Sequence, residues 1–275
     1  MNTSKYRLTV LLICVVIFGC SGMQPNSSST STGPVLARIQ QNGALRVGCT
    51  GDMPPLNMTT RDGELIGMEI ELAELIADAM GVKPEFVTLP FADLLPALRS
   101  GSIDVIISGM TITAERNLEV AFVGPYYKSG KAFLTRFKTV AAAKDPSELN
   151  SPKTRIAALK GSTSQEFVQN FIPQAMLYAT ADYQEAVQMV IDGRVDAMLA
   201  DYPICVVSVF RYPDAGLISL ISPLTYEPIG IAAPATDPLL LNWLQNHLNY
   251  LEETGVIERM HDRWFARGSW LERLP

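Results

Sequence analysis

The first half of the chain alternates short apolar runs with stretches whose apolar positions recur at helical spacing. The pattern predicts strands at 44–49, 83–89 and 103–108, and helices at 68–80 and 91–99. Gly81 and Gly101 follow the two helical stretches directly, as glycine commonly does where a helix stops. This strand–helix–strand order predicts a parallel sheet covered by helices.

The second half repeats the same order. It predicts strands at 154–159, 176–179 and 197–200, and helices at 163–170 and 183–191. Segments 98–104 and 190–196 also have the same predicted order of features: a helix end, a glycine that stops the helix, and a strand that begins with aspartate. We therefore expect an α/β protein with two similar lobes, each a mostly parallel sheet with flanking helices.

Two connections are expected to cross between these lobes. Residues 133–152 leave the first lobe, and residues 226–234 are extended and lead into two amphipathic helices at 239–251 and 256–265. We predict that lobe 1 comprises residues 36–129 and 230–275, and that lobe 2 comprises residues 130–229. Two such lobes form a cleft that a hinge can close, with ligands beyond the carboxyl ends of the strands.

The N-terminal 35 residues follow a different pattern. Lys5 and Arg7 precede an uncharged apolar run at 8–19, which is shorter than the roughly 20 residues that span a bilayer. Residues 1–19 are therefore predicted to be a signal peptide. The run ends in Ile17-Phe18-Gly19-Cys20, which resembles a bacterial lipobox with Cys20 as the lipidated residue. An ordinary signal cut near Gly22 is the alternative.

Residues 20–35 are mostly serine, threonine, glycine and proline, which is typical of a flexible tether. No later segment has 18 uncharged apolar residues in a row. We therefore expect an exported protein in the periplasm or at the outer face of the cell envelope, held to a membrane by its lipid alone.

Composition excludes one class of partner. The 275 residues are 48% hydrophobic and 18% charged, and the net charge of −6 becomes −8 once the leader with Lys5 and Arg7 is removed. An acidic surface of this kind excludes a nucleic-acid-binding face.

Cysteine and histidine are sparse in the mature chain. Cys49 and Cys205 either pair or remain two separate buried thiols, and both alternatives stay open. His247 and His261 are the two histidines, and no spacing typical of metal ligands occurs. We expect no cofactor and no metal.

Charged and polar residues follow the predicted strands. Arg116 suits a bidentate pair with a carboxylate, and Thr111, Gly109 and the helix start at Ser162-Thr163 add donors for the same anion. Asp201 suits an ammonium group. Such a set predicts a zwitterionic ligand. The structural alternatives are a solvated Arg116, an Asp201 that only caps a helix, and a turn with a cap at 161–163.

Several segments resemble a known family. The matching segments are 45–48, 67–73, 94–98, 103–109, 111–116, 121–126, 161–163, 193–197 and 230–232. The chain is similar over residues 36–267 to bacterial extracellular solute-binding proteins of family 3, the amino-acid receptors of ABC importers. Thr111-Ile112-Thr113-Ala114-Glu115-Arg116 is the most specific of these matches.

The resemblance implies the two-lobed type II periplasmic binding protein fold, with two hinge strands. By position, Arg116 would hold the α-carboxylate with Thr111, Gly109 and Thr163. Asp201 would hold the α-ammonium with a carbonyl of Ser108 or Gly109, and Phe91 would face the ligand side chain.

The chain departs from the family pattern in its first loop. Met53-Pro54-Pro55-Leu56 lacks the usual aromatic residue, and Thr50 stands where receptors for basic amino acids carry an acid. Together with Phe91, Met53 suggests a neutral or polar amino acid and argues against a basic one. Packing in an ordinary core is the alternative for Met53.

We expect a monomer that delivers an amino acid to an ABC transporter permease and that is not an enzyme. One rival is an enzyme similar to exported cyclohexadienyl dehydratases, which need a general acid near the ligand. We would expect that acid shortly after Asp201, where Tyr202-Pro203-Ile204-Cys205 contains none. The second rival is a sensor that signals to a separate partner.

Overall fold

A computed structural model describes residues 33–143, 145–219 and 224–275. The predicted signal peptide, Cys20 and most of the predicted tether lie outside these residues. Helix α1 (Pro34–Asn42) includes the last two residues of the predicted tether, because Pro34 suits the first turn of a helix and Leu36 and Ile39 are buried.

The first five-stranded sheet contains both ends of the described chain. Its strand order is β5 (Lys83–Thr88), β1 (Ala44–Cys49), β6 (Val105–Ile106), β13 (Glu227–Ala233) and β7 (Ala121–Ser129). The first three strands are parallel, and β13 is antiparallel to both of its neighbours. Strand β6 is shorter than expected, with two residues in place of the predicted 103–108.

The second sheet repeats this arrangement. Its order is β10 (Met176–Thr180), β9 (Arg155–Leu159), β11 (Ala197–Asp201), β8 (Lys131–Thr135) and β12 (Ile218–Ser219). Again three parallel strands are followed by an antiparallel one. The two-lobed α/β fold predicted from the sequence is confirmed, although both sheets are mixed and not mostly parallel.

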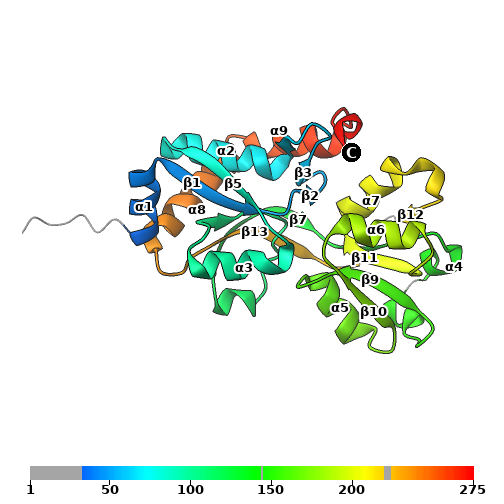
Figure 1. Ribbon diagram of the computed structural model, residues 1–275. Coiled ribbons are helices and arrows are strands. Elements are labelled where there is room, and N and C mark those ends of the chain that lie inside the picture. The colour runs from blue at the N-terminus through cyan, green and yellow to red at the C-terminus, as the bar shows by residue number, and fades with distance from the viewer. Residues whose placement is uncertain (1–32, 144, 220–223) are drawn as a thin grey trace, which may run out of the picture. The chain divides into compact units, whose positions relative to one another are not determined.

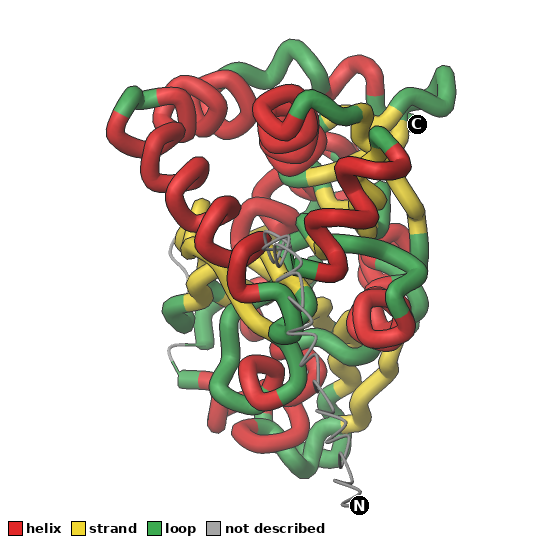
Figure 2. Tube along the Cα trace, turned by 90° about the vertical axis from the view of Figure 1, so that its left-hand side faces the viewer, coloured by secondary structure: helices red, strands yellow, loops and turns green. Residues whose placement is uncertain are grey.

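Helices cover the outside of each sheet, with strands inside, in both views (Figure 1, Figure 2). Around the first sheet lie α1, α2 (Met68–Met80), α3 (Phe91–Ser100), α8 (Pro238–Glu253) and α9 (Val256–His261). Around the second lie α4 (Lys138–Ala141), α5 (Thr163–Phe171), α6 (Tyr183–Ile191) and α7 (Tyr202–Arg211). A small sheet of β2 (Asp52–Met53), β3 (Asn57–Thr59) and β4 (Leu65–Ile66) adjoins the first lobe.

The matching segments at 98–104 and 190–196 have the same structure. Gly101 and Gly193 both adopt positive φ, +74° and +69°, where a side chain would be strained. Asp104 accepts hydrogen bonds from the backbone N–H and the guanidinium of Arg46, and Asp196 does the same with Arg155. Each aspartate thus joins the loop before one strand to the start of its neighbour.

The chain crosses between the sheets twice. Strand β7 ends at Ser129, and Gly130 connects it to β8 in the second sheet. Strand β13 returns to the first sheet, where Glu227 lies opposite Ser129. One buried apolar cluster includes Phe91 and Leu94 from the first lobe and Leu159 and Ala186 from the second, so apolar side chains of the two lobes pack against each other.

In the described part of the chain, no helix combines the length and the apolarity needed to cross a bilayer.

Candidate functional site

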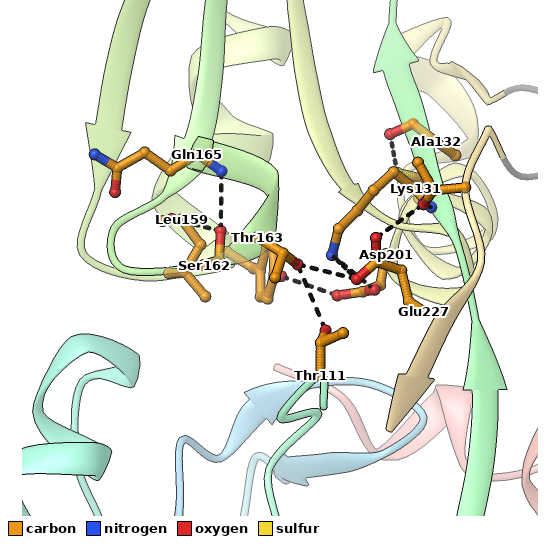
Figure 3. Close-up of polar contacts among 12 residues, drawn as sticks. Thr111, Lys131, Ala132, Leu159, Ser162, Thr163, Gln165, Asp201 and Glu227 are labelled. Atoms are coloured by element: carbon orange, nitrogen blue, oxygen red, sulfur yellow. Dashed lines mark hydrogen bonds and ion pairs between the residues drawn. The ribbon is translucent and has the colours of Figure 1, made fainter. Parts of the chain in front are cut away.

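Several of the residues expected to bind a ligand lie at or just after the ends of strands, where the two lobes meet. Thr111 follows β6 in the first lobe, and Thr163 starts α5 after β9 in the second. Their hydroxyl oxygens are 3.5 Å apart (Figure 3). The structure thus brings together two predicted site residues that are 52 residues apart in the sequence.

Arg116 is buried in this cleft. It opens a short 3₁₀ turn (Arg116–Leu118), and the residue is only 7% exposed, so a solvated surface arginine is excluded. One guanidinium nitrogen donates to the Thr111 carbonyl, and the other donates across the cleft to the Gly161 carbonyl, both at 3.0 Å. The Arg116 guanidinium lies over the Phe91 ring, and its central carbon is 5.7 Å from the ring centroid.

Nearby carboxylates interact electrostatically with the Arg116 guanidinium. Burial lowers its pKa from the usual value, and the negative charges of Glu166, Glu227 and Asp201 oppose that shift. Arginine stays protonated in proteins, so a cation is retained here. Two of its five N–H donors have the carbonyl partners named above, and others are available to an anion.

Asp201 belongs to a cluster with two residues that sequence reasoning missed. Lys131 Nζ lies 3.1 Å from Asp201 Oδ1 and 3.8 Å from Glu227 Oε2 (Figure 3). We call Lys131, Asp201 and Glu227 the acid–lysine cluster. Asp201 occupies the residue before α7, but its side chain makes no capping hydrogen bond, so the cap alternative is wrong.

Strand pairing brings this cluster together. Asp201 ends β11 and lies directly opposite Lys131, the first residue of the antiparallel strand β8. Glu227 begins β13, and Thr225 Oγ1 links it to Lys131 by accepting from the Lys131 backbone N–H and donating to Glu227. The available sequence signal is a lysine that opens the apolar segment Ala132-Phe133-Leu134.

The segment Gly161-Ser162-Thr163 divides into two roles. Ser162 Oγ accepts from the Gln165 backbone N–H and donates to the Leu159 carbonyl, so this residue caps α5 as the alternative interpretation proposed. Thr163 instead donates to Glu227 Oε2 at 3.2 Å. Thr163 therefore links the acid–lysine cluster to Thr111 in the opposite lobe.

A buried carboxylate, that of Glu69, binds the loop that contains Ser108 and Gly109. Glu69 has no exposed surface, and its Oε1 accepts from the Gly109 N–H at 2.6 Å and from the Tyr126 hydroxyl. Burial raises the pKa of Glu69 above its usual value, although these hydrogen bonds lower it. The Gly109 N–H, which the sequence assigned to a ligand carboxylate, thus donates to Glu69 here.

Met53 and Phe91 lie in the same buried apolar cluster, with 1% and 5% exposure. The Ser108 hydroxyl lies 3.7 Å from the Met53 sulfur. Phe91 also lines a cavity of about 530 Å³. The other lining residues are Thr50, Asp52, Thr88, Leu89, Pro90, Leu159, Ala181, Asp182, Gln184 and Glu185. Both lobes contribute to this cavity, and three of its lining side chains are acidic.

The two remaining cysteines are separate buried thiols. Burial is the main cause that raises the pKa of Cys49 to about 12, so its thiolate is disfavoured. Among residues 33–143, 145–219 and 224–275, no group of three or more His, Cys, Asp and Glu side chains is arranged to hold a metal ion.

Known proteins share this fold and sequence. A cyclohexadienyl dehydratase from Pseudomonas aeruginosa is 23% identical over 96% of both chains. The glutamine-binding protein of a Bacillus subtilis ABC transporter is 28% identical over 95% of this chain and 94% of its own. A Wolinella succinogenes ABC-transporter binding component, solved as a complex with lysine, superimposes with a TM-score of 0.79. It is 35% identical and covers 84% of this chain and 99% of its own.

The chain also matches the model of a protein family. The match extends over residues 45–267 and so includes both sheets and every charged residue of the cleft described above. The chain therefore belongs to the bacterial extracellular solute-binding proteins, family 3.

Proposed function

We propose that the protein captures one amino acid between its lobes and delivers it to an ABC importer. The ligand α-carboxylate would lie on Arg116, with the hydroxyls of Thr111 and Thr163 beside it. The observation that carries this proposal is the buried Arg116 guanidinium, which lies in the same cleft as the carboxylates of Asp201 and Glu227 that pair with Lys131. Enclosing such a cation without an anionic partner costs several kcal/mol.

The α-ammonium would lie at the acid–lysine cluster, near Asp201 and Glu227. These two carboxylates share a single lysine, so one negative charge remains for the ligand. A carbonyl of Ser108 or Gly109 would add an acceptor from the first lobe.

The ligand side chain would enter the cavity beside Phe91. We propose a neutral or polar side chain, because Thr50 offers no charge and Phe91 offers an apolar face. A basic side chain is the rival, favoured by Asp52, Asp182 and Glu185 on the cavity wall and by the lysine complex of the Wolinella protein. Met53 would pack behind this pocket.

Export and anchoring are also part of the proposal. Residues 1–19 would direct secretion, and Cys20 would carry the lipid that holds the protein at the periplasmic or extracellular face of a membrane. The protein would act as a monomer and meet a transporter permease when the lobes close.

A calorimetric and thermal-shift screen of the twenty amino acids tests the function. Ligand at a hundredfold excess over its Kd stabilises the folded protein by about 2.7 kcal/mol. Arg116→Ala should abolish that shift, whereas Arg194→Ala, a change at an exposed arginine, should leave it intact. The proposal fails if no amino acid binds, or if Arg116→Ala binds as tightly as the unaltered protein.

A dehydratase is the second candidate function. The sequence around Asp201 lacks the extra carboxylate that we expected for a general acid, but strand pairing brings Glu227 close to Lys131 and Thr163. Glu227 could therefore supply the general acid of a dehydratase, and the similarity to the dehydratase from Pseudomonas aeruginosa supports this second candidate. Turnover of prephenate or arogenate by the purified protein, lost in Glu227→Gln, would favour the enzyme.

A further inference from the structure

Four buried charged residues lie where the amino and carboxylate groups of the ligand are proposed to bind, and their charges sum to zero. Arg116 and Lys131 are 7% and 1% exposed, and Asp201 and Glu227 are 4% and 9% exposed. Glu166 also interacts with Arg116, but it is exposed and its charge is screened by solvent. The amino and carboxylate groups of a zwitterionic ligand can therefore bind at these four residues without leaving an unbalanced charge among them.

We infer that Lys131 is a specificity-determining residue, whose ammonium cancels one of two cleft carboxylates and so selects ligands with a single ammonium group. This inference rests on the proposed function. Without Lys131, two carboxylates would face the amino end of the ligand, and a molecule with one additional positive charge would balance them better.

Lys131 is fixed in place and cannot act as a surface counter-ion. Its side chain is buried, its residue pairs with Asp201 across two strands, and its backbone N–H donates to Thr225 at 3.0 Å. A lysine held in this way contributes its charge to every ligand that enters.

The cluster also reaches the contact between the lobes. Glu227 accepts from the Thr163 hydroxyl, and Thr163 touches Thr111 of the first lobe. The charge on Lys131 is therefore felt where the ligand is enclosed, and not only within the second lobe.

Lys131→Met, Glu227→Gln and the double variant test the inference by calorimetry with glutamine, lysine and glutamate as ligands. Lys131→Met should shift the ratio of Kd values for glutamine and lysine roughly tenfold toward lysine. Glu227→Gln should shift preference toward glutamate. The double variant restores a net charge of zero and should return preference to glutamine. Lys128→Met, at an exposed lysine three residues away, should change none of these ratios.

Each outcome decides the question. If Lys131→Met is folded but keeps the ligand ranking of the unaltered protein, Lys131 does not set specificity. If Lys131→Met does not fold, Glu227→Gln and the double variant decide. An unchanged ligand ranking in Glu227→Gln, or a changed ranking in the double variant, overturns the inference. If the unaltered protein binds none of the amino acids, the proposed function fails first, which separates the two.

Discussion

The Asp52 carboxylate of the first lobe accepts a 2.8 Å hydrogen bond from the backbone N–H of Tyr183, the first residue of α6 in the second lobe. The same helix has its own cap, since Asp182 accepts from the Glu185 N–H. One helix start is therefore capped twice, once within its lobe and once from across the cleft. The second cap exists only while the lobes are together.

Asp52→Ala is therefore expected to weaken the closed state. Loss of a cap costs about 1 kcal/mol, which corresponds to about a fivefold rise in ligand Kd. Calorimetry with the amino acid identified in the screen measures this effect. Asp145→Ala is the control, because Asp145 caps the 3₁₀ turn Pro146–Leu149 outside the ligand cavity, and its loss should leave the Kd unchanged. Equal Kd values for Asp52→Ala and the unaltered protein would contradict this role.

Asp104 is expected to make stability depend on pH. Burial alone would raise the pKa of its carboxyl, but the hydrogen bonds from Arg46 and Arg38 outweigh burial and lower it. A lowered pKa stabilises the fold above the unfolded-state pKa of about 4, and this stabilisation is lost as the pH falls further. Asp104→Asn should cost about 2 kcal/mol of unfolding free energy at pH 7.

Urea unfolding at pH 7 and at pH 3 checks this dependence. The difference in unfolding free energy between Asp104→Asn and the unaltered protein should be smaller at pH 3, where the carboxyl group of Asp104 is becoming protonated. Asp62→Asn, at an exposed turn, should have the same unfolding free energy as the unaltered protein at both pH values. If Asp104→Asn lowers the unfolding free energy equally at pH 7 and at pH 3, the ionised form of Asp104 does not stabilise the fold.

Helix ends and the alternation of strands and helices along the chain were predictable because local chemistry determines them. Helix α2 has the predicted bounds, and Gly81 has the positive φ of +69° that stops it. Arg116, Thr111 and Thr163 could be placed together because each follows the carboxyl end of a parallel strand, and ligands bind beyond those ends, where the two lobes face each other.

The acid–lysine cluster could not be predicted in the same way. Lys131, Asp201 and Glu227 come from three strands, and their proximity depends on antiparallel register between β8 and β11 and on the return of β13. Local sequence does not determine register between segments 70 residues apart. A buried lysine also looks like a surface lysine in sequence until its partners are known.

Glu69 is expected to position the loop that carries Ser108 and Gly109. Its carboxylate receives N–H donors from Gly109 and Asn57 and the hydroxyl of Tyr126. Glu69→Gln turns one acceptor into a donor that faces another donor, so we expect a loss of about 1–3 kcal/mol in unfolding free energy. Tyr126→Phe removes a single donor and should cost less. Chemical denaturation compares them, and a larger loss for Tyr126→Phe would refute this order.

The C-terminal segment connects the two lobes outside the cleft. Trp270 and Leu274 pack in a buried cluster with Met58 and Ile66 of the first lobe and with Val207 on α7 of the second. The chain end is also held there, because the Arg211 guanidinium on α7 donates to the Pro275 carbonyl at 2.6 Å. This contact with α7 adds to the hydrogen bonds between the lobes in the cleft.

Leu274→Ala should therefore change both stability and ligand release. Removing a buried leucine side chain lowers the unfolding free energy by about 2 kcal/mol or more. Because part of the lost packing is against α7, the closed form loses more than an open form, and stopped-flow measurements should show faster ligand dissociation. Leu239→Ala removes the same atoms from an exposed leucine on α8 and should change neither quantity. If Leu274→Ala loses stability but releases ligand at an unchanged rate, the segment supports the first lobe alone and does not help to hold the lobes together.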